Sequence, residues 1–209
     1  MNKKSRAIAL PAGVLAGVLV LAGCAAQDGV TPGMGGGPGG MMTQTSEPGA
    51  DFNAADEMFL VMMIPHHQQA IEMADILLDK SGIPDEVTEL AQKIKDVQGP
   101  EIETMRSWLE EWNVDYDEDA MGGMGGMGGM GHGDGMMSDG DMTALEDASG
   151  AHAARLFLEQ MIVHHEGAID MGEMALRGAQ NPDVIALIDK IIADQTAEIA
   201  TMRDLVEAV

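Results

Sequence analysis

The sequence predicts an all-α protein, a four-helix bundle made of two related helical hairpins. Hydrophobic residues make up 45% of the 209 residues, enough for a core, but aromatic residues make up only 3%. A core built from Ala, Ile, Leu, Val and Met favours helices over sheets. Apolar residues recur at helical spacing in two stretches, residues 51–113 and 143–209, and these stretches repeat each other. We therefore expect two short-looped hairpins packed around one core.

The N-terminus has the layout of a bacterial lipoprotein signal. Basic residues precede a short apolar run, residues 7–21, which is too short and wrongly flanked for a stable membrane span. Leu21-Ala22-Gly23-Cys24 then has the pattern of a lipobox, at which such proteins are cleaved and acylated on Cys. We expect residues 1–23 to be removed and Cys24 to anchor the protein outside the cytoplasm, on the bacterial cell membrane. An ordinary secretory signal followed by a chance Cys is the alternative.

Two segments have compositions typical of disorder. Residues 24–50 are rich in Gly, Pro and Thr and predict a flexible tether. Residues 114–142 form a linker that contains a Met-Gly-Gly repeat, and so much Gly disfavours regular structure.

The first hairpin is delimited by standard helix signals. Asp51 is the expected N-cap of a helix that continues to about residue 80, where Ser81-Gly82 breaks it. Pro84 then opens a second helix that reaches about residue 113.

The second hairpin has similar signals. The capping-box pattern from Thr143 to Glu146 opens a third helix that ends near Gly178. Asn181-Pro182 caps and opens a fourth helix, which reaches the C-terminus.

The repeat carries the residues of chemical interest. Residues 59–73 match residues 157–171, and each copy holds an adjacent His pair with a Met three residues before it and another seven residues after its first His. The second helices match as well. The corresponding residues are Met63, His66, His67, Met73, Gln98, Glu101 and Met105 in the first copy, and Met161, His164, His165, Met171, Gln195, Glu198 and Met202 in the second.

Helical geometry suggests how these side chains are placed. His66 and His164 fall on the core stripe, whereas His67 and His165 lie about 100° further round, toward a neighbouring helix or the rim. Hairpin pairing is expected to set the first His of each copy level with Gln98 or Gln195, and the preceding Met level with Glu101 or Glu198. A carboxylate beside a buried His holds its second ring nitrogen, so these four residues are candidates to orient the imidazoles. The two Gln side chains could instead form hydrogen bonds between helices.

Imidazole and thioether together form a soft to borderline ligand set. Such a set suits Cu(I) and, where His dominates, Cu(II), whereas zinc prefers Cys, more His or carboxylate, and iron and manganese prefer carboxylate. The candidate copper ligands are Met63, His66, His67, Met73 and Met105, and their counterparts Met161, His164, His165, Met171 and Met202. The alternative is that the Met stripe is simply core and that the His residues are structural.

The linker offers an auxiliary copper trap. Its donors are Met121, Met124, Met127, Met130, His132, Met136 and Met137. Clustered thioethers favour Cu(I), and Gly lets the chain wrap around an ion. The alternative is an inert spacer, although a spacer has no need of a residue that is prone to oxidation.

Charge and Cys content exclude several classes of partner and site. The formal net charge is −24, which argues against binding to nucleic acid or adhesion to anionic lipid. A single Cys allows neither a disulfide within the chain nor a Cys-based zinc or iron–sulfur site.

The repeated motif resembles a known bacterial family. Met-Ile-Pro-His66-His67-Gln-Gln-Ala-Ile-Glu-Met-Ala, together with Gln98-x-x-Glu-Ile-x-x-Met105, is similar to the family called domain of unknown function three-hundred-and-five, over residues 51–113 and 144–207. The resemblance implies a secreted ferritin-like four-helix protein that binds copper through Met and His and is associated with copper tolerance.

The second copy departs from the first beside the His pair. Pro65 and Gln68-Gln69 are replaced by Val163 and Glu166-Gly167, which leaves the ligands intact but is expected to make the two sites unequal.

The expected function is therefore that of an extracytoplasmic, lipid-anchored copper-binding protein. It would sequester copper, or deliver it to a copper-exporting or copper-accepting protein, and binding without turnover is favoured over an enzyme. A ferritin-like cuprous oxidase is the main competing function. A di-iron enzyme is disfavoured, because no Glu stands three residues before either His pair. The pattern is also compatible with non-covalent haem held by His and Met, or with a metal-free surface protein.

Overall fold

The computed structural model describes residues 51–117 and 135–209, and this part of the chain is helical, with no strand. Its elements are α1 (Ala54–Leu78), α2 (Asp85–Glu111), α4 (Asp139–Asp147), α5 (Gly150–Ala175) and α6 (Pro182–Ala208). The predicted signal peptide, Cys24 and the tether to residue 50 lie outside the described residues. So do the linker donors Met121, Met124, Met127, Met130 and His132.

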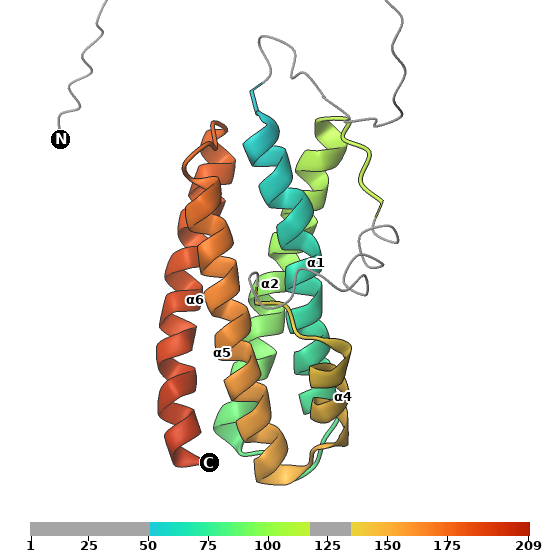
Figure 1. The fold of residues 1–209 in the computed structure, drawn as a ribbon, viewed down its shortest axis with the longest axis vertical. Coiled ribbons are helices and arrows are strands. Elements are labelled where there is room, and N and C mark those ends of the chain that lie inside the picture. Colours follow the sequence, from blue (N-terminus) through green and yellow to red (C-terminus); the bar gives the residue numbers. More distant parts are fainter. Residues whose placement is uncertain (1–50, 118–134) are drawn as a thin grey trace, which may run out of the picture. The chain divides into compact units, whose positions relative to one another are not determined.

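The four long helices form an antiparallel bundle (Figure 1). α1 packs on α2 and α5 on α6, which are the two predicted hairpins, and α1 also packs against α5. The short helix α4 lies against α1 and α5. The predicted all-α bundle of two repeated hairpins is confirmed. Among the described residues, no helix is both long enough and apolar enough to cross a membrane.

The N-cap of α1 differs from the expectation. Asn53, not Asp51, caps the helix, because its side chain accepts hydrogen bonds from the backbone N–H groups of Ala55 and Asp56. The Asp56 carboxylate in turn accepts the N–H of Asn53 at 2.8 Å, which completes a capping box. This reciprocal pair leaves Asp51 outside the helix, where its carbonyl oxygen accepts a hydrogen bond from Asn181.

The expected third helix, from Thr143 to about residue 178, was wrong as one continuous element. The chain forms two helices, α4 and α5, separated by the extended residues Ala148 and Ser149. Ser138 and Asp141 form the capping box that opens α4, so this helix begins before Thr143 and inside the expected linker. Gly150 starts α5 with a φ of 55°, a conformation that glycine adopts at little cost.

The core consists of two apolar clusters on either side of a polar layer. The Phe157 cluster holds the ends of α1 and α6, the first half of α2 and the N-terminal part of α5, and includes Met73, Met161 and Met202. The Phe59 cluster holds the remaining parts of the four helices and includes Met63 and Met105, with Met171 packed against it. Along each long helix the buried polar residues between the two clusters are His, Gln or Glu, so a polar layer crosses the middle of the bundle.

Candidate metal centre

Four His side chains meet inside this polar layer. His66, His67, His164 and His165 are all at most 1% exposed. The rings of His66 and His164 contact each other across α1 and α5, with centroids 3.7 Å apart and planes inclined by 39°. The repeats therefore meet at equivalent residues, and an approximate twofold relation passes between these two rings. Of the two orientations expected for His67 and His165, the structure shows the one that faces a neighbouring helix.

Each outer His is held by a carboxylate. His67 Nε2 lies 2.9 Å from Glu101 Oε2, and His165 Nε2 lies 2.9 Å from Glu198 Oε2. The expectation had placed Glu101 level with Met63 rather than with His67. Side chains lean toward the N-terminus of their own helix, and the two helices of a hairpin run in opposite directions. Two side chains whose tips meet therefore start from residues nearer the C-terminal ends of their helices than a pair at the same backbone level.

Each carboxylate is also paired with a lysine from the other hairpin. Lys190 Nζ on α6 donates to Glu101 Oε1 on α2 at 2.8 Å, and Lys93 Nζ on α2 lies 3.2 Å from Glu198 Oε1 on α6. The result is two corresponding His–Glu–Lys networks that cross between the hairpins, with a Lys–Glu hydrogen bond in the first and an ion pair in the second. Sequence analysis missed both lysines, although Lys93 and Lys190 have the same separation as Glu101 and Glu198 and could have been found from the repeat.

These contacts determine the charge of the layer. Burial alone would raise the pKa of Glu101, but its hydrogen bonds with His67 and Lys190 outweigh this and hold that pKa below its usual value. The pKa of Glu198 is lowered in the same way, by His165 and Lys93 against the effect of burial. Both glutamates are therefore carboxylates at neutral pH.

Burial also governs the histidines. It lowers the pKa of His164 well below its usual range, and the neighbouring His66 and His165 lower it further. Burial likewise lowers the pKa of His165, against the opposing hydrogen bond to Glu198. His164 and His165 are thus neutral imidazoles near pH 7, the form in which a ring nitrogen can bind a metal ion.

The hydrogen bonds leave specific lone pairs available. A carboxylate only accepts hydrogen bonds, so Nε2 of His67 and of His165 carries a proton, and in the neutral imidazole Nδ1 then carries the lone pair. Within the described part of the chain, both Nδ1 atoms are buried without a hydrogen-bond partner, as are both ring nitrogens of His164. Leaving a buried polar atom without a partner costs the folded protein roughly 1–3 kcal/mol. A metal ion bound to these ring nitrogens would remove that cost, so the arrangement suits a metal site.

Thioethers flank the His layer on both sides, in sets drawn from both hairpins. Met63 and Met105 belong to the Phe59 cluster with Met171, whereas Met161 and Met202 belong to the Phe157 cluster with Met73. Met63 and Met73 are ten residues apart on α1, about 15 Å along the helix. The structure therefore does not bring together the two Met residues of one motif. It places each beside Met residues of the other repeat.

The two Gln side chains lie in the same layer. Gln98 is 2% exposed and Gln195 is 3% exposed. Among residues 51–117 and 135–209, neither side-chain amide atom of Gln98 has a hydrogen-bond partner. Gln195 Oε1 has none there either. The hydrogen bond between helices that was the alternative role of Gln98 is absent from this part of the structure.

The described residues hold no group of three or more His, Cys, Asp or Glu side chains that could hold a metal ion. Thioether sulfur lies outside that set of donors. Of the linker donors, Met136 and Met137 lie in the described residues, immediately before α4.

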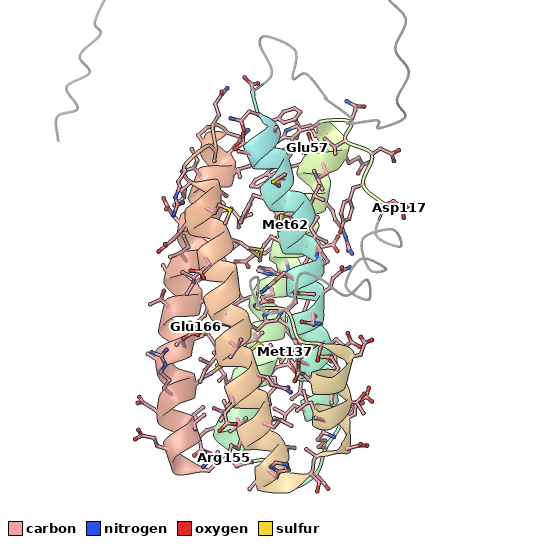
Figure 2. The ribbon with its side chains drawn as sticks, in the orientation of Figure 1. Glu57, Met62, Asp117, Met137, Arg155 and Glu166 are labelled. Atoms are coloured by element: carbon pink, nitrogen blue, oxygen red, sulfur yellow. The ribbon has the colours of Figure 1, made fainter. Side chains whose placement is uncertain are left out.

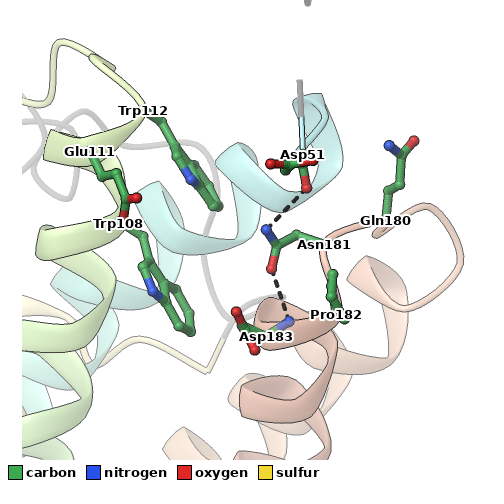
Figure 3. A pocket seen from close by; sticks show the side chains of 8 residues that line it. All are labelled: Asp51, Trp108, Glu111, Trp112, Gln180, Asn181, Pro182 and Asp183. Atoms are coloured by element: carbon green, nitrogen blue, oxygen red, sulfur yellow. Dashed lines mark hydrogen bonds between the residues drawn. The ribbon is translucent and has the colours of Figure 1, made fainter. Parts of the chain in front are cut away.

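One surface pocket lies at an end of the bundle and another lies on its side. One, of about 470 Å³, is lined by Trp108, Trp112 and the Asn181 turn, and none of the candidate ligands lines it (Figure 3). The other, of about 380 Å³, lies between α2 and α6 and is lined in part by Glu101 and Lys190. It gives the first His–Glu–Lys network an opening to solvent.

Comparisons with known proteins agree with this architecture. The chain resembles a DUF305 fragment from Deinococcus radiodurans at 28% identity, with a TM-score of 0.66, covering 76% of this chain and 99% of that one. A DUF305 protein from Streptomyces coelicolor is 30% identical, with a TM-score of 0.65 and coverage of 74% and 93%.

The protein CopM is also similar. Its Cu(I)-bound form is 30% identical, with a TM-score of 0.59, and covers 73% of this chain and 96% of its own. Its Cu(II)-bound form is 34% identical, with a TM-score of 0.61 and the same coverage. Silver-bound and apo forms of CopM match as well. No curated protein matches the chain.

These likenesses confirm the predicted all-α, ferritin-like bundle. The family model "Domain of unknown function (DUF305)" matches residues 56–206, which include both hairpins and all four buried histidines. The chain therefore belongs to the DUF305 family.

Proposed function

We propose that this protein binds copper in the middle of its helix bundle. The observation that carries the proposal is the buried layer of four histidines flanked by thioethers, in which ring nitrogens of His67, His164 and His165 have no hydrogen-bond partner among the described residues. Neutral imidazole and thioether suit Cu(I), and imidazole also accepts Cu(II). The similarity to CopM, which has been crystallised with Cu(I), Cu(II) and silver, supports the choice of metal.

The surrounding residues have distinct tasks in this proposal. Nδ1 of His67 and of His165 would bind the metal, because Glu101 and Glu198 hold the opposite nitrogen. His66 and His164 would supply imidazole between the two networks. The Met residues of the two clusters would supply thioether. Lys93 and Lys190 hold the glutamates as carboxylates, and so fix the tautomers without contacting the ion.

The physiological role follows from this site and from the N-terminal signal. The protein would be lipid-anchored at Cys24, outside the cytoplasm, and would sequester copper or hand it to an exporting or accepting protein. The Met-rich linker would collect Cu(I) for the bundle. Binding without turnover explains the features described, since the glutamates are engaged by His and Lys.

Titration of the full chain with Cu(I) against a chromogenic chelator tests the metal site. We expect submicromolar binding that survives deletion of residues 121–134 and is lost in the double variant His66→Ala with His164→Ala. Far-UV circular dichroism controls for folding, and Fe(II), Zn(II) and haem are titrated for comparison. Full Cu(I) binding by a folded double variant would contradict the proposed site. Oxygen uptake on adding Cu(I) would instead favour the oxidase.

Lipid anchoring needs a separate experiment. Cells expressing the full chain are fed a labelled fatty acid, and the variant Cys24→Ser is the control. We expect label and membrane fractionation in the wild type alone. Equal label in both would contradict an anchor at Cys24.

A further inference from the structure

The end of the Met-rich linker is docked on the bundle, across the face formed by α1 and α5. Residues 135–138 lead into α4 and are seen in Figure 1 as the yellow trace that crosses from α5 toward α4. Gly135 is buried and has a φ of 77°. A Cβ at this position would lie 2.7 Å from the carbonyl oxygen of Val163 and 2.9 Å from both His164 O and Gly167 Cα. Only glycine fits so close to the α5 backbone, and the backbone that it approaches includes the carbonyl oxygen of His164.

A single side chain of α1 holds the next part of this segment. Gln69 Nε2 donates to the carbonyl oxygen of Met137 at 2.9 Å, and the N–H of Met137 donates to Gln69 Oε1 at 2.7 Å. This double hydrogen bond satisfies both ends of the amide and both backbone groups of Met137. We call residues 135–137 the strap.

The strap uses the positions at which the two repeats differ. Gln69 of the first copy corresponds to Gly167 of the second. Gln69 binds the strap at Met137, and Gly167 lies against it at Gly135. The difference between Gln69 and Gly167 is thus explained as the two halves of one docking site.

The strap brings a further thioether to one side of the His layer. His66 contacts His164 between antiparallel helices, so Gln69, three residues later, is level with Met161, three residues earlier. Met137 is partly buried and packs against the Phe157 cluster, which holds Met161, Met73 and Met202. No strap residue packs against the Phe59 cluster within the described part of the chain. Figure 2 labels Met137 on this face of the bundle.

We infer that Met137 is a thioether ligand of the copper site on the Met161 side, and that Gln69, Gly135 and Gly167 position it there. This inference rests on the proposed copper function. It makes the two sites unequal: the Met161 side gains the thioether of Met137, delivered by the linker, and the Met63 side has the thioethers of the bundle alone. The strap also ties the Cu(I)-collecting linker to the site that it would load.

The test uses the full chain and two pairs of variants. Met137→Leu keeps the volume and removes the sulfur, and Met142→Leu is its control, because Met142 on α4 packs against the same cluster. Gln69→Leu removes both hydrogen bonds, and the neighbouring Gln68→Leu is its control. Affinity is measured with Cu(I) under chelator competition. Ligation is followed with Ag(I) by NMR of chains labelled at the Met methyl groups, and docking by the exchange rate of the Met137 amide.

We expect Ag(I) to shift the Met137 methyl signal at the same ratio of metal to protein as that of Met161. Met137→Leu should weaken one class of Cu(I) site about tenfold or more and leave the other unchanged, and Met142→Leu should bind as the wild type does. Gln69→Leu should speed exchange of the Met137 amide at least tenfold and weaken the same class of site, whereas Gln68→Leu should do neither.

The outcomes separate this inference from the proposed function. Wild-type Cu(I) binding that is unchanged in Met137→Leu, with no Ag(I) shift of the Met137 signal, overturns the inference and leaves the copper site standing. Absence of Cu(I) binding in the wild type overturns both, and slow exchange of the Met137 amide would then show the strap to be structural only.

Discussion

The two repeats are alike at the His layer and different beside it. Each has a buried His pair, a glutamate that holds the second His and a lysine from the opposite hairpin. They diverge at Gln69 and Gly167, where the strap docks. The shared features are those that the proposed metal site requires, and Gln69 and Gly167 contact the strap. A duplicated hairpin has thus kept its chemistry in both copies and used its divergence to attach a segment across one face.

The largest expected effect tests the shared part. Glu101→Gln and Glu198→Gln each replace the carboxylate that holds a His Nε2 by a neutral amide, which no longer fixes the tautomer. We expect each to weaken one class of Cu(I) site on the order of 10- to 100-fold. Glu103→Gln is the control, since Glu103 is exposed and pairs with Arg106 on its own helix. A loss in one variant and none in the other would show that the two networks are not equivalent.

Acid should destabilise the metal-free protein through the same layer. The folded-state pKa values of His164 and His165 lie below the ordinary 6.5, so the unfolded chain binds more protons as the pH falls below that value. The contribution of these histidines to the free energy of unfolding is therefore fully present above about pH 6.5. Below that pH it decreases, by up to about 1.4 kcal/mol per pH unit for each His.

The lowered pKa values of Glu101 and Glu198 extend this loss below their ordinary 4.5, because the unfolded chain protonates them first. Urea unfolding between pH 7.5 and pH 5.5 measures the histidine part, with His152→Gln, on an exposed residue, as the control. A free energy of unfolding that stays constant over this range would contradict a neutral, buried His layer.

A smaller effect is expected where the repeats differ. Gly135→Ala adds a Cβ at a positive φ against the α5 backbone, so we expect a loss of about 1–3 kcal/mol in the free energy of unfolding. Gly140→Ala is the matched control, because its Cβ would meet only Ser138 Oγ, at 3.6 Å. It should change stability by less than about 1 kcal/mol. Equal values for the two variants in urea unfolding would mean that the strap does not dock.

The lysines should give the smallest effect. Lys93→Met and Lys190→Met keep most of the side-chain volume and remove the charge, and the lysine side chains are 62% and 54% exposed. Because the lysine end of each pair is exposed, we expect each lysine to contribute about 1 kcal/mol or less. We expect a larger loss for Lys190, which lies 2.8 Å from Glu101, than for Lys93, which lies 3.2 Å from Glu198. The reverse order in urea unfolding would contradict the geometry.

The sequence predicted most of what is repeated along the chain and part of what is local. Helical periodicity and the duplicated His motif predicted the hairpins, and Asn181 caps α6 as expected. The break between α4 and α5 was missed, because Thr143 and Glu146 form a plausible capping box whereas Ser138 and Asp141 form the one that is used. Spacing along one helix grouped Met63 with Met73, although the thioether sets are formed between hairpins.

Contacts between distant residues account for the rest. The pairing of His67 with Glu101 depends on how side chains lean on antiparallel helices, and the lysines reach across from the other hairpin. The sequence around Gly135 does not predict that this residue lies against the backbone of His164, because the contact forms only when the bundle folds. Comparing the repeats does mark positions 69 and 167 as divergent, but only the structure shows what binds there.

Copper X-ray absorption of the Cu(I)-loaded chain lacking residues 121–134 tests the central claim most directly, because it reports the atoms bound to the metal once the competing linker donors are gone. We predict mixed nitrogen and sulfur neighbours, with the nitrogen contribution lost in the His66→Ala, His164→Ala double variant. Coordination by sulfur alone or by oxygen alone, unchanged in that variant, would contradict a copper site in the His layer.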